Sequence, residues 1–116
     1  MTEVIKFSDW QKLDLRTGKI LKAEDIDGAD KLYKLSVDLG KENGKITVVA
    51  GIKPYYKKEE LNGKNCVIFT NLEQRKIKGI ESQGMLLAAV KEIENGKEVV
   101  KILQPDSDIE EGSRIR

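Results

Sequence analysis

Apolar and polar residues alternate with a period of two in several separate segments of this chain. The clearest run is residues 33–39, where Tyr33, Leu35, Val37 and Leu39 alternate with polar side chains. This alternation is typical of a half-buried β-strand, and short apolar runs between turn residues are typical of buried ones. The strands predicted in this way are residues 14–24, in which Gly18 is a candidate bend or bulge, 33–39, 46–50, 65–69, 85–90 and 98–103.

Two short helices and three turns are expected between these strands. Residues 8–13 start with Ser8 and have Gln11 three positions later, which is the pattern of a capping box; Trp10 on this helix is expected to pack. Residues 55–61 follow the break at Lys53-Pro54 and precede Gly63, a glycine stop. The composition of residues 25–30, 40–45 and 94–97 predicts turns.

The order of these elements indicates an all-β fold with short helices. Three strands, a helix and then further strands is the order of an oligonucleotide-binding barrel, and a compact β-sandwich is the alternative. A chain of 116 residues is expected to form one domain. We place its core at about 14–103, an N-terminal helical lead at 1–13, and a polar tail at 104–116 that is either a frayed end or an element of a dimer interface.

The composition removes most kinds of catalytic and metal site. The chain has no histidine, which is the commonest general base and metal ligand, and its one cysteine, Cys66, lies beside Val67 and Ile68 and is expected to be a buried thiol. We therefore expect no catalytic residue, no metal and no cofactor. The formal net charge is +1, so any binding of phosphate has to be local.

Nothing in the sequence indicates a membrane protein. There is no stretch of about 18 apolar residues, and the N-terminus has neither the apolar centre nor the cleavage site of a signal peptide. A cytoplasmic location is expected.

Residues 71–90 join a cationic segment to an apolar run. Arg75, Lys76 and Lys78 lie within four residues of one another, and the run 85–90 that follows them is expected to be core. Gly79 and Gly84 are points where the backbone can turn sharply or approach another molecule closely. A solvated hairpin loop is one interpretation of this segment, and an anion-binding loop held by strands is the other.

Five segments of the chain share a pattern with a known family: residues 14–20 (DLRTGKI), 29–33 (ADKLY), 37–40 (VDLG), 49–52 (VAGI) and 71–89, the last of which contains SQGMLLAA. Together they resemble the tRNA-binding domain that is appended to methionyl-tRNA synthetases, stands free beside them, and occurs in the endothelial monocyte-activating polypeptide family. Two positions depart from the family pattern: Ala50 stands where serine is frequent, and Gln74 stands where proline is usual.

The resemblance implies a homodimeric barrel that binds the outside corner of tRNA with little sequence preference, alone or as an auxiliary module or β subunit of methionyl-tRNA synthetase. Folded RNA is recognised mainly through phosphates, shape and 2′-hydroxyls, which suits cations and small polar side chains. The candidate residues are Arg75, Lys76, Lys78 and Lys31 for phosphates, Asn71, Ser82 and Gln83 for hydrogen bonds to backbone or ribose, and Met85, which matches the motif but is equally typical of core.

A chaperone that binds polypeptides is the alternative from another class. Bacterial export chaperones resemble the same dimeric barrel and share the opening Asp-Leu-Arg-Thr-Gly, here residues 14–18. Their loops usually lack the run SQGMLLAA, which this chain has at residues 82–89. The sequence therefore favours the tRNA-binding function.

Overall fold

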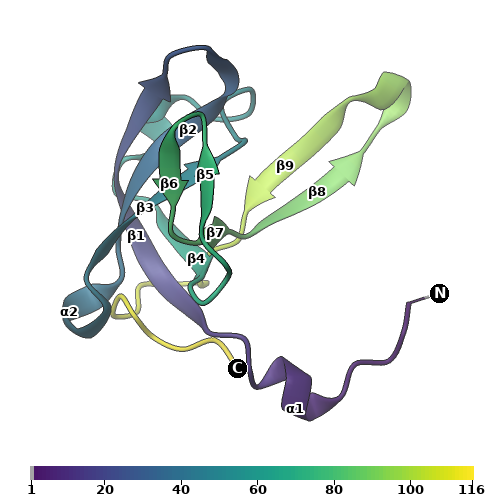
Figure 1. Ribbon diagram of the computed structural model, residues 1–116. Coiled ribbons are helices and arrows are strands. Elements are labelled where there is room, and N and C mark those ends of the chain that lie inside the picture. The colour runs from purple at the N-terminus through teal and green to yellow at the C-terminus, as the bar shows by residue number, and fades with distance from the viewer. Residues whose placement is uncertain (1) are drawn as a thin grey trace.

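Antiparallel strands make up most of the chain, which a computed structural model describes over residues 2–116; the first residue of the predicted lead lies outside this range. The helices are short, and the tail is mostly irregular (Figure 1). In chain order the elements are α1 (Phe7–Trp10), β1 (Leu15–Ile26), β2 (Ala29–Asp38), α2 (Gly40–Asn43), β3 (Lys45–Ala50), α3 (Lys58–Leu61), β4 (Asn65–Phe69), β5 (Arg75–Ile77), β6 (Ile80–Ser82), β7 (Met85–Leu86), β8 (Ala88–Glu92), the 3-10 turn η1 (Glu94–Gly96) and β9 (Glu98–Ile102).

The main sheet has the order β3-β2-β1-β4-β7, and every pairing in it is antiparallel. It curls around one apolar core, to which α3 adds Leu61. The alternation predicted for residues 33–39 is confirmed, because all four apolar side chains of that run are buried and the intervening ones are not. The largest side chains that are shielded completely are Ile20, Leu35, Leu61, Ile68, Val37, Val48 and Cys66.

The two edges of this sheet, β3 and β7, approach each other without a continuous ladder. The gap is bridged at Gln83, whose backbone N–H donates to the carbonyl of Thr47 and whose side-chain oxygen accepts from the N–H of Thr47, both at 2.8 Å. The result is an oligonucleotide-binding type of barrel, with α3 between β3 and β4 as the predicted order requires. The predicted strand 65–69 is confirmed as β4.

The short helices and turns begin and end at other residues than predicted. The predicted helix 8–13 is one turn, α1, with no capping side chain; the predicted helix 55–61 is reduced to α3; and residues 40–43 form α2 inside a predicted turn. The turn expected over residues 25–30 is only two residues long, because β1 and β2 are both longer than predicted. The bulge in β1 falls between Ile20 and Lys22, not at Gly18.

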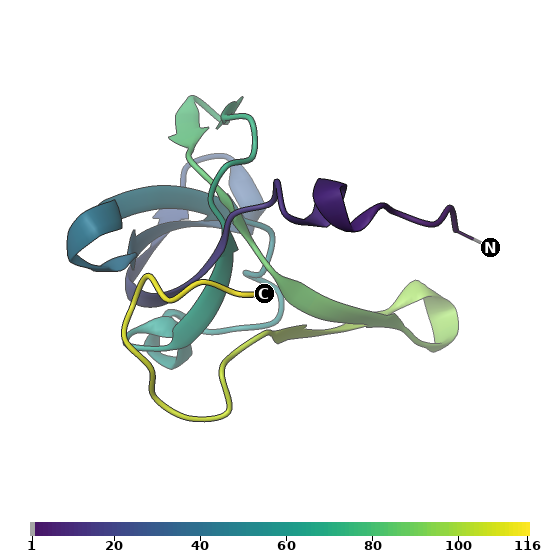
Figure 2. The same cartoon turned by 90° about the horizontal axis from the view of Figure 1, so that it is seen from below.

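The prediction that residues 85–90 form one core strand is wrong. Leu87 ends the pairing of β7 with β4, and the chain then pairs β8 with β9 in a separate hairpin that projects from the barrel (Figures 1 and 2). Val90, on this hairpin, is 57% exposed, and Met85, in β7, is 41% exposed. An apolar run does not distinguish a core strand from one that leaves the barrel.

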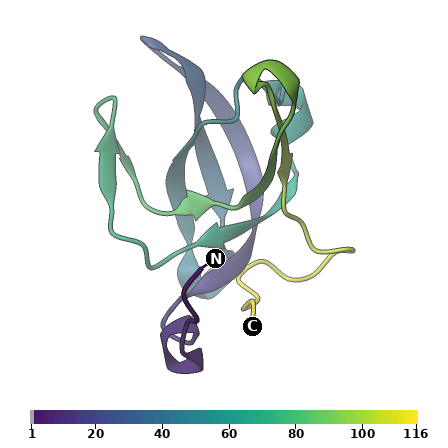
Figure 3. The same cartoon turned by 90° about the vertical axis from the view of Figure 1, so that its right-hand side faces the viewer.

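The tail folds back on β1 and is not a frayed end. Backbone bonds join Gly112 and Ser113 to Thr17, and Ile115 to Leu15, at 2.8–2.9 Å. They occupy the edge of β1 that β2 leaves open, and the tail runs beside that strand in Figure 3. Arg16 also donates to the carbonyl of Gly112 at 3.0 Å.

Candidate nucleic-acid interface

The cationic segment forms a hairpin of two short strands, β5 and β6, against the front of the barrel in Figure 1. Ile77 pairs with Ile80, so the turn consists of Lys78 and Gly79 alone. Both have positive φ, 51° and 78°, which is the geometry of a two-residue type I′ turn. Glycine adopts it freely, whereas Lys78 is held in a conformation that lysine rarely takes. The turn therefore fixes the point from which the Lys78 side chain projects.

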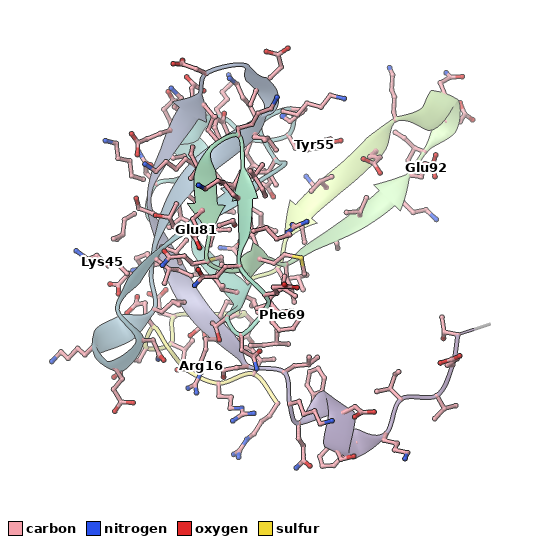
Figure 4. All side chains as sticks on the ribbon, viewed as in Figure 1. Arg16, Lys45, Tyr55, Phe69, Glu81 and Glu92 are labelled. Carbon is pink, nitrogen blue, oxygen red and sulfur yellow. The ribbon has the colours of Figure 1, made fainter. Side chains whose placement is uncertain are left out.

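Apolar contacts seat this hairpin on the barrel. Ile77 and Ile80 lie on its inner face and pack against a second buried cluster, formed by Ile26, Ala29 and Val49. Leu32 adds to the same cluster. Because strand side chains alternate between faces, the outer face of the hairpin carries Lys76 and Glu81. Figure 4 shows Glu81 on this hairpin, at the front of the molecule.

Ser82, Gln83 and Gly84 attach the end of the hairpin to β3. The hydroxyl of Ser82, which is 4% exposed, accepts from the N–H of Val49 at 3.0 Å and donates to the carbonyl of Gly84 at 3.1 Å. A Cβ on Gly84 would lie 3.0 Å from both the Ile68 side chain and the Phe69 carbonyl, so any other residue there requires these neighbours to shift. The three residues form a structural clasp between β3, β4 and the hairpin.

Lys31 is brought to this hairpin by a bulge in β2. Ile26 pairs with Ala29 and Asp25 with Tyr33, so residues 30–32 have no partners on β1. Bulges re-aim side chains in this way. Lys31 and Lys78 line one open depression of about 280 Å³ with Gly28, Ala29, Asp30 and Leu32. The predicted pairing of Lys31 with the cationic segment thus has a geometric counterpart.

Four exposed cations lie on or beside this hairpin, and we call Lys31, Arg75, Lys76 and Lys78 the cationic face. Lys76 is on the outer face of the hairpin, Lys78 is at its turn, and Lys31 shares the depression with Lys78. Arg75 begins β5 and pairs with Ser82. Among residues 2–116 no carboxylate lies within 4.0 Å of their side-chain nitrogens; the ion pairs in that range involve other lysines and Arg16. A cation without a partner in the protein is available to a phosphate.

Asn71 and Met85 occupy different positions from these cations. The side-chain oxygen of Asn71 accepts from the N–H of Asp14 at 2.8 Å, and its amide donates to the carbonyl of Lys12 at 2.7 Å. Through these two hydrogen bonds, Asn71 joins the loop before β5 to the segment that leads into β1. Met85 pairs with Phe69 and is half-exposed, so it is not the core filler that one interpretation suggested.

The candidate residues thus form two groups. The cations are exposed and have no ion-pair partner within residues 2–116, whereas Ser82, Gln83 and Asn71 use their polar atoms within the protein. Direct contact of these three with RNA stays a prediction, and the structure gives each a positioning role. Sequence reasoning missed the seat formed by Ile77 and Ile80, although two isoleucines flanking Lys-Gly is a recognisable hairpin signal.

Ion pairs support the segment next to Lys31. The carboxylate of Asp25 lies 2.5 Å from the ammonium of Lys58 and 3.0 Å from that of Lys53, and hydrogen bonds from Lys58 and then Lys53 lower the pKa of Asp25. Lys53 also donates its backbone N–H to the carbonyl of Lys31 at 3.3 Å. The bulge that carries Lys31 is thereby connected to α3.

Metal-ligand clusters, the free thiol and long apolar helices can be checked directly over residues 2–116. No three side chains among His, Cys, Asp and Glu approach closely enough there to hold a metal ion. Cys66 is buried as predicted, and burial raises the pKa of its thiol to about 12, so it is a poor nucleophile near neutrality. None of the helices over residues 2–116 has the length and apolar character to cross a membrane.

The chain is similar in sequence and in structure to several known proteins. The chain is 51% identical over 114 residues to a methionine–tRNA ligase of Pyrococcus horikoshii, which covers 98% of this chain but 15% of that protein. Among solved structures, a MetRS related protein from Pyrococcus horikoshii has a TM-score of 0.86 and 36% identity, covering 99% of this chain and all of that one. Chaperone CsaA from Bacillus anthracis str. Ames has a TM-score of 0.84 and 30% identity, covering 98% and 100%.

The chain spans about 15% of the length of the curated ligases that it matches. A family model with the description "Putative tRNA binding domain" matches residues 15–114, from the first residue of β1 to the tail segment that pairs with it. This match covers both the cationic face and the clasp. The chain belongs to the tRNA-binding domain family.

Proposed function

We propose that this protein binds the outside corner of tRNA through the cationic face. The observation that carries the proposal is four exposed, unpaired cations on a hairpin and a bulge that are both anchored to the core. Rigid placement lowers the entropy lost on binding, since the backbone carrying three of the four is already ordered. A chain with a net charge of +1 has no general attraction for nucleic acid, so this local group must supply it.

The proposed recognition is tolerant of sequence. The contacting groups are ammonium and guanidinium ions, which suit phosphates, and no aromatic side chain lines the depression between Lys31 and Lys78 to stack on a base. Different tRNAs should therefore bind within about tenfold, or 1.4 kcal/mol, of one another.

Filter binding with several purified tRNAs and an unfolded polypeptide tests the proposal. We expect every tRNA to bind in the same range and the polypeptide to bind far more weakly. A preference of several decades for one tRNA would point to base readout, and tight binding of the polypeptide alone would refute the tRNA function.

We further propose that two chains act as a homodimer in the cytoplasm, alone or as an auxiliary module of methionyl-tRNA synthetase. Two apolar arms project from the same side of the barrel, the segment around α1 and the β8–β9 hairpin (Figures 1 and 2). A second copy would cover both arms and set two cationic faces on one particle. The exposed apolar side chains of these arms are Val4, Ile5, Phe7, Trp10, Val90, Ile93 and Val99.

This arrangement moves the proposed interface away from the tail. The sequence leaves open that the tail is an element of a dimer interface, but the backbone of Ile115 bonds to β1, and among the large apolar side chains of the tail it is Ile109 that is exposed. Deleting the tail would uncover the edge of β1, so such a deletion tests folding more than dimerisation.

A polypeptide chaperone is the second candidate function, and the same apolar arms favour it. The similarity to chaperone CsaA covers nearly the whole chain. Two variants separate these functions. Removing the cations should weaken tRNA binding and spare a chaperone, whereas making the arms polar should weaken polypeptide binding and leave each chain its cationic face.

A further inference from the structure

The depression that Lys31 and Lys78 line also contains a carboxylate, for which binding of phosphate by the cationic face gives no reason. Asp30 lines it together with Lys31 and Lys78. It is exposed, and among residues 2–116 its side chain has neither a hydrogen-bond partner nor a cation within 4.0 Å. The bulge in β2 directs both Asp30 and Lys31 to this place. The depression therefore offers positive groups and an unneutralised acceptor side by side.

A carboxylate there opposes the binding of phosphate unless it receives a hydrogen bond from the ligand. An ionised carboxylate only accepts, and phosphate oxygens only accept as well. Along a nucleic-acid backbone the group that donates is the 2′-hydroxyl of ribose, which DNA lacks. A pocket with two ammonium groups and one carboxylate thus matches a phosphate with its neighbouring ribose better than it matches phosphate alone.

Resting on the proposed tRNA-binding function, we propose that Asp30 is a specificity-determining residue that accepts a hydrogen bond from a ribose 2′-hydroxyl while Lys31 and Lys78 bind the adjacent phosphate. A charge-assisted bond of this kind favours RNA over a backbone without the donor by about tenfold. The same carboxylate repels a phosphate backbone that cannot donate. Asp30 thereby gives up affinity for nucleic acids in general and gains selectivity for RNA.

The test is a double-mutant cycle that compares the affinities of protein variants for an RNA with and without its 2′-hydroxyls. The probes are an RNA minihelix with the acceptor stem and T arm of a tRNA, and the same minihelix with every ribose 2′-O-methylated, which keeps base edges and phosphates but removes the donor. The proteins are the parent, Asp30→Ala and Asp30→Asn. Asp27→Ala is the matched control, because Asp27 is an exposed aspartate in the turn just before β2 and does not line the depression.

We expect the parent and Asp27→Ala to prefer unmodified RNA by about tenfold, and Asp30→Ala to bind both RNAs equally. The affinity of Asp30→Ala for methylated RNA should equal or exceed that of the parent, because a repulsive charge is gone. Asp30→Asn should lie between, since its amide oxygen still accepts.

The opposite pattern overturns the assignment. If Asp30→Ala keeps the tenfold preference of the parent, or if the parent has none, Asp30 does not read the 2′-hydroxyl while the tRNA-binding function still stands. If the parent fails to bind unmodified RNA or whole tRNA at all, the proposed function fails and this assignment fails with it.

Discussion

Two antiparallel hairpins follow each other in this chain, and they differ in what holds them. The β5–β6 hairpin is seated by Ile77 and Ile80 and clasped at its end by Ser82. The β8–β9 hairpin is held mainly through β9, where Val100 and Ile102 enter the core and the Tyr55 hydroxyl donates to the carboxylate of Glu98 at 3.2 Å. Its other strand, β8, is exposed from Ala89 to Glu92, and Figure 4 shows Glu92 at the outer end of this hairpin.

The two hairpins also differ in the side chains that they expose. The seated hairpin is short and carries three exposed cations against Glu81, whereas the projecting one balances three lysines, Lys91, Lys97 and Lys101, with acids and adds exposed apolar side chains. An isolated two-stranded ribbon is marginally stable in water. This difference supports the proposals that the first hairpin presents charge to tRNA and that the second is covered by another protein chain.

The largest effect is expected from removing the charges of the seated hairpin. The triple variant Arg75→Ala, Lys76→Ala, Lys78→Ala should lose about a hundredfold in affinity for tRNA, or about 2.7 kcal/mol, by losing phosphate contacts. Its thermal unfolding should stay within about 2 °C of the parent, because the three side chains are exposed and have no ion pairs in the described residues. Filter binding and calorimetry measure the two quantities.

The projecting hairpin supplies the matched control for this variant. Replacing Lys91, Lys97 and Lys101 by alanine removes the same number of charges and should change tRNA affinity by less than about threefold, an effect of bulk charge alone. Equal losses from both hairpins would erase the distinction between them.

The second effect concerns the clasp. Gly84→Ala should destabilise the fold by about 2 kcal/mol, since the new Cβ would lie 3.0 Å from both Ile68 and Phe69 in a packed region. Gly51→Ala is the control, because a Cβ there meets Leu32 only at 3.8 Å, an ordinary contact. Urea unfolding of both variants checks this, and an unchanged midpoint for Gly84→Ala would show that the close approach is not restrictive.

The sequence predicts the barrel well and the two hairpins poorly. The apolar patterns of residues 33–39 and 65–69 identify strands correctly because both segments lie inside the main sheet, with a paired strand on each side and the core against their apolar side chains. It could not place residues 85–90, because apolar side chains look the same whether the chain's own core or another molecule covers them. Ser82 was predicted to contact RNA because a hydroxyl suits a ribose and a backbone N–H equally, and only the fold brings it to Val49.

The third effect tests the covering of the projecting hairpin. The change of Val90, Ile93 and Val99 to serine should weaken self-association at least tenfold, or about 1.4 kcal/mol, because these side chains are exposed in one chain and buried in the proposed dimer. Sedimentation over a range of concentrations measures it. Ile109→Ser on the tail is the control and should leave the mass unchanged; a reversed outcome would return the interface to the tail.

The smallest effect is a pH dependence of stability, which we expect from the ion pairs of Asp25 next to the bulge that carries Lys31. Lys58 and Lys53 lower the folded-state pKa of Asp25, so its contribution to stability is present above its unfolded pKa near 3.8 and is lost as pH falls through the folded value. Between about pH 5 and pH 2 the parent should therefore lose more stability than Asp25→Asn. Parallel acid titrations of urea midpoints would contradict the pairing.

The central claim, that the seated hairpin supplies the electrostatics of tRNA binding, is tested most directly by the salt dependence of affinity. With about four phosphates neutralised, raising salt from roughly 50 to 200 mM should weaken the parent on the order of a hundredfold. The triple alanine variant should retain a log–log slope of about −1 in place of about −4, and the control with three lysines removed from β8–β9 should keep the slope of the parent. A parent affinity that does not change with salt, or a triple variant with the parent's slope, would contradict the claim.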